Sequence, residues 1–137
     1  MANPMVVVAI LSGSASDAAI VDKTAAVLAR NGITYDTRVI SAHREPDTLD
    51  QYIKTSDCKI FIAIAGLSAA LPGVIASKTE KPVIGVPVSV GYGYMGEGRA
   101  ALASMLQSCS VISVVNIDAG FTAGAFAARI ANIGGKK

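Results

Sequence analysis

The sequence has one histidine, two cysteines and no tryptophan in 137 residues, and these scarcities exclude several kinds of site. Structural zinc sites draw mainly on cysteine and histidine, but Cys58 and Cys109 are far apart and lack metal-type spacing. We therefore expect no metal site. Both cysteines lie among apolar residues, so we expect buried free thiols in a reducing, cytoplasmic compartment.

Charge of one sign is also scarce. Twelve Lys and Arg residues against ten Asp and Glu leave a net charge of +2, and the only basic run is Lys136-Lys137. This small excess does not predict binding to nucleic acid. The first apolar run is too short to span a membrane and follows no basic segment, so we expect neither a membrane partner nor a targeting signal.

Short apolar runs alternate with helical patterns along the chain. Unbroken apolar runs suit strands that are covered on both faces. Strands are predicted at residues 6–11, 35–40, 60–65, 83–88 and 111–115, with Pro87 weakening the fourth, and helices at 16–31, 46–55, 69–78, 98–108 and 122–132. This order predicts one domain over residues 1–137: an α/β three-layer αβα sandwich with a doubly wound, parallel five-stranded, flavodoxin-like sheet in the order 2-1-3-4-5.

Four distinctive stretches follow the first four predicted strands. They are SGSASD at residues 12–17, SAHREPD at 41–47, AGLSAALPG at 65–73 and SVGYGYMGEG at 89–98. Ligands of such sheets bind beyond the carboxyl ends of the strands, so these stretches should meet at one site.

The first stretch has the composition of a phosphate-binding turn. Gly13 permits close approach to the backbone N–H groups of a helix N-terminus, and Ser14 and Ser16 can add hydroxyl donors. A second interpretation stays open, in which Ser14 or Ser16 only caps the helix and Asp17 complements its dipole.

The second stretch holds the only histidine beside an arginine. His43 could transfer protons near neutral pH, and Arg44 could bind a phosphate through two hydrogen bonds. The alternative is a loop histidine bonded to the backbone beside a solvated arginine. In the third stretch Gly66 could present main-chain amides or only mark a tight turn. The fourth could be a flap over the site or an ordinary surface loop.

Together these motifs resemble the family of N5-carboxyaminoimidazole ribonucleotide mutases and aminoimidazole ribonucleotide carboxylases of purine biosynthesis. The matching motifs are G-S-x-S-D at residues 13–17, S-A-H-R-x-P-D at 41–47, part of the third loop, and KPVIGVPV. The resemblance implies a cytoplasmic isomerase or carboxy-lyase without a cofactor, acting as a homo-octamer on a ribonucleotide with CO₂ or its carbamate. It implies that His43 is catalytic and that the substrate contacts Gly13, Ser14, Asp17, Ser41, Arg44, Gly66, Ser68 and Leu71.

Two departures from the family pattern leave alternatives open. Ala70 stands where the mutases have a second histidine, and Ser68 partly matches the direct carboxylases, whereas Arg44 matches the mutases. The motifs VGYG, MLQSC and VVNIDAGF also resemble a carboxylase of a nicotinate dinucleotide in nickel-pincer cofactor synthesis, in which Cys109 would attack the pyridine ring. A non-enzymatic flavodoxin-like module that binds FMN, with Tyr92 or Tyr94 on the flavin, is a further alternative.

The carboxy-terminal stretch predicts self-association. Residues 120–133 form a helical pattern with Arg129 as the only charged side chain. A helix that is apolar nearly all round is not typical of a monomer surface, and its small residues would allow close approach to a neighbour.

Overall fold

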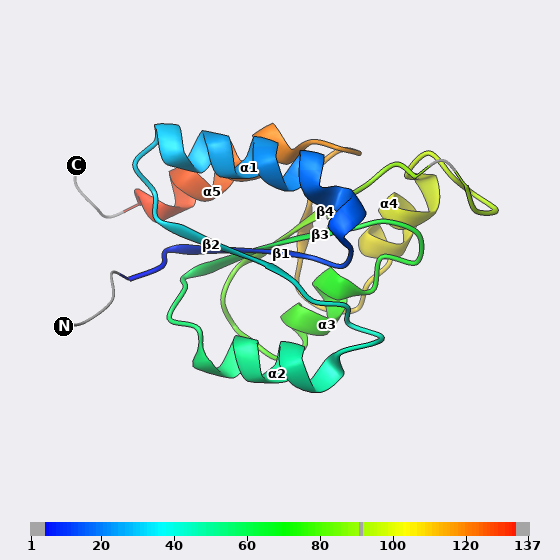
Figure 1. Ribbon diagram of the computed structural model, residues 1–137, viewed down its shortest axis with the longest axis horizontal. Helices are drawn as coiled ribbons and strands as arrows, with labels where there is room; N and C mark the ends of the chain where they lie inside the picture. Colours follow the sequence, from blue (N-terminus) through cyan, green and yellow to red (C-terminus); the bar gives the residue numbers. More distant parts are fainter. Residues whose placement is uncertain (1–4, 91, 134–137) are drawn as a thin grey trace.

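The computed structural model describes residues 5–90 and 92–133, which form three layers (Figure 1). The sheet has five parallel strands in the order β2-β1-β3-β4-β5. The strands are β1 (Val8–Ser12), β2 (Tyr35–Val39), β3 (Ile60–Ala65), β4 (Val83–Pro87) and β5 (Ser113–Val114). The predicted doubly wound α/β fold and its strand order are confirmed.

Helices cover both faces of this sheet. On one face α1 and α5 lie side by side, and α2, α3 and α4 pack on the other (Figure 1). The helices are α1 (Ala18–Arg30), α2 (Pro46–Thr55), α3 (Leu71–Ala76), α4 (Arg99–Leu106) and α5 (Gly120–Ala131), and a 3-10 turn, η1 (Ala15–Asp17), precedes α1. No helix among the described residues is long and apolar enough to cross a membrane.

Successive residues of the central strands enter two separate hydrophobic cores. In β1, Val8 and Ile10 pack in the core beneath α1 and α5, whereas Ala9 and Leu11 pack in the core beneath α2 and α3. All five residues of β1 are buried, as are all six of β3. The unbroken apolar runs therefore predicted these central strands correctly.

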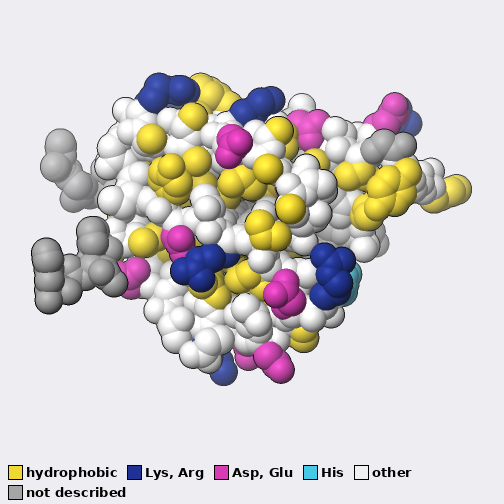
Figure 2. Space-filling model, viewed as in Figure 1, with side chains coloured by type: hydrophobic (Ala, Val, Ile, Leu, Met, Phe, Trp, Pro, Cys, Tyr) yellow, Lys and Arg dark blue, Asp and Glu magenta, His cyan; other side chains and the backbone are white. Residues whose placement is uncertain are grey.

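The edge strands differ from the prediction. β5 has only two residues instead of five, and Val111, predicted to begin it, is 89% exposed. β2 also leaves most of its residues exposed, including Val39. An edge strand has a hydrogen-bonding partner on one side only, and here the helices do not cover it as they cover the centre. Figure 2 shows hydrophobic side chains on this face of the molecule, over α1 and β2 and at the tip before α4.

The small residues of α5 have a role inside the chain. A Cβ atom on Gly120 would lie 2.7 Å from Thr24 Oγ1, and one on Gly124 would lie 2.9 Å from the Thr24 carbonyl oxygen. The small side of α5 is thus buried against α1, which corrects the expectation that it faces a neighbouring subunit. The two aromatic residues of α5, Phe121 and Phe126, remain exposed.

Candidate active site

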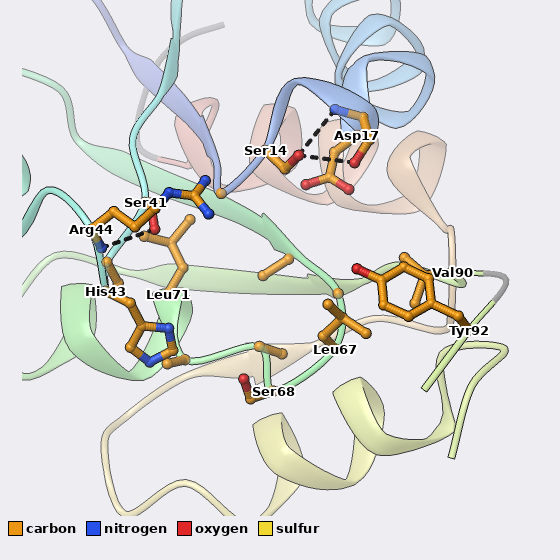
Figure 3. A pocket seen from close by; sticks show the side chains of 17 residues that line it. Ser14, Asp17, Ser41, His43, Arg44, Leu67, Ser68, Leu71, Val90 and Tyr92 are labelled. Carbon is orange, nitrogen blue, oxygen red and sulfur yellow. Dashed lines mark hydrogen bonds between the residues drawn. The ribbon is translucent and has the colours of Figure 1, made fainter. Parts of the chain in front are cut away.

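A cavity of about 260 Å³ lies at the carboxyl ends of the central strands. That volume is close to the lower end of the ~300–1,000 Å³ usual for small-molecule sites. All nine residues predicted to form the site line it. Its lining residues are Gly13, Ser14, Ser16, Asp17, Ser41, Ala42, His43, Arg44, Ala65, Gly66, Leu67, Ser68, Ala69, Ala70, Leu71, Val90 and Tyr92 (Figure 3).

The loop after β1 presents two hydroxyls and a buried carboxylate. The Ser14 side chain accepts a hydrogen bond from the Ser16 backbone N–H at 3.2 Å, and the two hydroxyl oxygens lie 2.9 Å apart. Ser14 therefore caps η1, as the structural interpretation of this loop predicted, and also faces the cavity. Ser14 can cap η1 and still face a ligand, because both Ser14 and Ser16 line the cavity.

Asp17 is 4% exposed although it is acidic. Burial raises the pKa of its carboxyl group, a backbone hydrogen bond from Ser14 opposes that increase, and the negative charge of Asp118 adds to it. A buried carboxylate at a cavity wall is a strong acceptor for ligand hydroxyl groups. It is also costly to keep in place, which favours a functional role over a purely structural one.

The loop after β2 is a compact turn that leaves the side chains of His43 and Arg44 free. The Ser41 hydroxyl accepts the Arg44 backbone N–H at 3.1 Å, and the Glu45 carboxylate accepts the Ser41 N–H at 3.2 Å. His43 and Arg44 are exposed, and within the described residues neither side chain has a hydrogen-bond or ion-pair partner. The alternative of a loop histidine bonded to the backbone is thus not observed. In Figure 3 the Arg44 guanidinium points into the cavity on the side of Ser14, and the His43 ring lies on the side of Ser68.

The loop after β3 has an unusual backbone. Leu67 and Ala69 have φ angles of 54° and 50°, a region that residues with a Cβ atom rarely adopt. Such strain costs ~1–3 kcal/mol per residue and concentrates at functional sites. The Ala69 N–H donates to the Gly66 carbonyl at 2.9 Å, and the Ser104 hydroxyl of α4 donates to the Ser68 carbonyl at 2.8 Å.

Two large side chains of the cavity wall, Leu67 and Val90, were missed from the sequence, and a third, Tyr92, was named only in the FMN-binding alternative. The glycine-rich stretch was expected near the site, yet nothing in its composition showed which residue turns inward. Tyr92 lines the cavity, whereas Tyr94 is fully exposed and does not.

The two features that departed from the family pattern lie next to each other. Ala70 borders the cavity and also a neighbouring cavity of about 360 Å³ that contains Cys109. Cys58 is buried as predicted, but Cys109 is exposed, so that prediction was wrong for Cys109. The reason is that Cys109 follows α4 in a serine-rich turn, and is not part of the helix face that enters the core.

The sheet topology and the position of the cavity define the class: a doubly wound α/β protein with a ligand site beyond the carboxyl ends of its strands. The sequence matches the AIR carboxylase family over residues 7–137. The chain therefore belongs to the AIR carboxylase family.

Individual relatives agree with this assignment. An N5-carboxyaminoimidazole ribonucleotide mutase of Methanocaldococcus jannaschii is 43% identical over 125 residues, which are 90% of this chain and 77% of that protein. A probable N5-carboxyaminoimidazole ribonucleotide mutase of Methanobrevibacter smithii is also 43% identical, but this chain spans only 37% of its length. The crystal structure of Treponema denticola PurE has a TM-score of 0.77 at 30% identity and covers 90% of this chain and 78% of its own.

Proposed function

We propose that the protein forms 4-carboxy-5-aminoimidazole ribonucleotide in purine biosynthesis. The observation that carries this proposal is the meeting of a serine-rich helix start, Arg44 and the only histidine at one cavity. The names of the relatives support an N5-carboxyaminoimidazole ribonucleotide mutase. They favour it over the nicotinate dinucleotide carboxylase and the FMN-binding module considered from the sequence.

The proposed roles follow from the chemistry of each side chain. Arg44 and the Ser14 loop hold the phosphate, because a guanidinium and hydroxyl or amide donors together neutralise and orient it. Asp17 accepts hydrogen bonds from the ribose hydroxyls. Gly66, Ser68 and Leu71 contact the base, and His43 transfers protons.

The reaction requires one proton to move from carbon to nitrogen. Loss of CO₂ from the carbamate nitrogen needs a proton on that nitrogen, which a protonated His43 supplies. The electron-rich C4 of the ring then attacks the CO₂ that is held beside it, an effective-concentration effect. Removal of the C4 proton by the now neutral His43 restores the aromatic ring and leaves the imidazole as it began. Phosphate contacts remote from the ring supply the binding energy for this positioning.

An ultraviolet assay with two substrates tests the activity. Purified protein is given N5-carboxyaminoimidazole ribonucleotide, or aminoimidazole ribonucleotide with bicarbonate. We expect turnover of the first substrate, and turnover of the second alone would make the protein a direct carboxylase. His43→Asn should fold normally and lose ~10²–10⁴-fold in turnover. A variant with near wild-type turnover would remove His43 from the mechanism.

We further propose a cytoplasmic homo-octamer. The octamer is implied by the family, and the exposed Phe121, Phe126 and Val39 are large apolar side chains that association would cover. Light scattering at micromolar concentration decides this. A mass of one 13.9 kDa chain would refute association, and a tetramer would refute only the octamer.

A further inference from the structure

The turn between β5 and α5 is hydrogen-bonded to the end of β4 and to the segment that follows it. The Asp118 carboxylate accepts two hydrogen bonds from Ser89, one from its backbone N–H at 2.9 Å and one from its hydroxyl at 2.5 Å. The Asp118 N–H in turn donates to the Pro87 carbonyl at 2.8 Å. Three hydrogen bonds from one residue thus fix the chain where it leaves the sheet.

The same turn also contacts the far end of that segment. A Cβ atom on Gly98 would lie 2.5 Å from Ile117 Cγ2, so Gly98 packs directly against the residue before Asp118. Gly98 has a φ of 85°, which suits glycine and lets α4 begin at this point. Ile117 and Asp118 therefore hold both ends of the segment between β4 and α4.

This segment supplies one wall of the candidate site. Val90 follows Ser89 directly and lines the cavity, and Tyr92 lies two residues further on. Val90 also packs against the loop after β3, since a Cβ atom on Gly66 would lie 3.2 Å from Val90 Cγ1. A displacement of Ser89 would consequently move Val90 relative to Gly66.

We propose that Asp118 is a positioning residue of the candidate site, which holds the Val90 and Tyr92 wall against the loop after β3 through its hydrogen bonds to Ser89. Asp118 does not line the cavity, so it does not contact the ligand directly. Its φ of 60° lies in the left-handed region, which aspartate adopts more readily than most residues with a side chain.

The proposal rests on the proposed function, and kinetics of paired variants test it. Asp118→Ala should raise KM about 2- to 30-fold, the range for residues that act on a site without touching the ligand, with a smaller change in kcat. The wall contacts the substrate before and during the reaction, so its loss removes uniform binding. Ser89→Ala should raise KM less, because it removes the hydroxyl hydrogen bond to Asp118 and keeps the backbone one. The double variant should raise KM no more than Asp118→Ala alone, because the two substitutions break the same interaction. Asp22→Ala, an exposed carboxylate on α1, is the matched control and should leave KM unchanged.

A second measurement needs no substrate. The chain has no tryptophan, so Tyr92→Trp places a single fluorophore in the wall itself, at a position that is 68% exposed and can become more so. Adding Asp118→Ala to this variant should increase acrylamide quenching, whereas adding Asp22→Ala should not change it. Unchanged KM in a folded Asp118→Ala or Ser89→Ala variant, or unchanged quenching, overturns the proposal. If the wild type turns over neither ribonucleotide, the proposed function fails and the quenching alone decides the role of Asp118.

Discussion

Asp17→Asn should make the protein more stable at neutral pH while weakening its ligand site. Asp17 is almost fully buried, and it forms no ion pair within the described part of the chain. Its raised pKa means that the folded environment disfavours the charged carboxylate. An amide of the same shape removes that charge. We expect the free energy of unfolding to rise by roughly 1–2 kcal/mol at pH 7, in the range for an incompletely compensated buried polar group.

The pH dependence has a definite sign. The folded state binds the Asp17 proton more tightly than the unfolded state, whose pKa is near the ordinary 3.8. The contribution of Asp17 to the stability of the wild type therefore falls as the pH rises from about 3.8 through the raised pKa of the folded state. The Asp17→Asn variant has no carboxyl group to ionise at this position, so it does not lose this stability. The advantage of the variant should be full at neutral pH and should shrink as the pH falls toward 3.8.

Thermal and urea unfolding at several pH values measure this difference. A gain of 1–2 kcal/mol corresponds to a rise in Tm of roughly 3–10 °C for a chain of this size. Asp22→Asn, an exposed position on α1, is the control and should show no gain. A less stable Asp17→Asn variant at pH 7, or a pH-independent difference, would refute the reasoning. A stabilised variant with weaker ribonucleotide binding is the behaviour expected of a residue kept for function.

Three further substitutions test other parts of the structure. Arg44→Ala should weaken ribonucleotide binding about 10- to 100-fold but leave binding of the dephosphorylated nucleoside nearly unchanged, and equal losses would mean that Arg44 does not contact phosphate. Gly120→Ala should lower stability by about 1–3 kcal/mol, because its Cβ would lie 2.7 Å from Thr24 Oγ1, whereas Gly13→Ala meets nothing within 4 Å and should not; equal Tm values would contradict the close packing of α1 and α5. Cys109→Ser should keep turnover within a few-fold, since Cys109 lies in the neighbouring cavity, and an inactive but folded variant would favour a nucleophilic thiol.

The sequence predicted the central fold well because local and global signals agree there. The run at residues 60–65 coincides with β3, and Pro46 begins α2 as predicted. Pro87 proved compatible with the end of β4, where it pairs with Ala65. The edges were harder, since the exposed Val111 is the same type of residue as those buried in the central strands and only the absence of a covering layer distinguishes it.

Contacts between loops were not predictable from composition. The motifs placed His43 and Arg44 near the site because every strand end in a parallel sheet meets the same edge. The hydrogen bonds between Ser89 and Asp118 join two loops 29 residues apart, and no sequence spacing predicts them. The positive φ of Leu67 was not predictable from the sequence either, because leucine rarely adopts that conformation.

The single imidazole of this cavity is sufficient for the proposed chemistry because of the proton balance. In the mutase reaction the proton that C4 loses equals the one that nitrogen gains, so one His43 can donate first, accept second and end in its starting state. Ala70, which replaces a second histidine of the mutase pattern, thus removes no group that this balance requires. Direct carboxylation is different, since it releases one proton per turnover. His43 would begin neutral and then lose the proton to water, which its exposure permits.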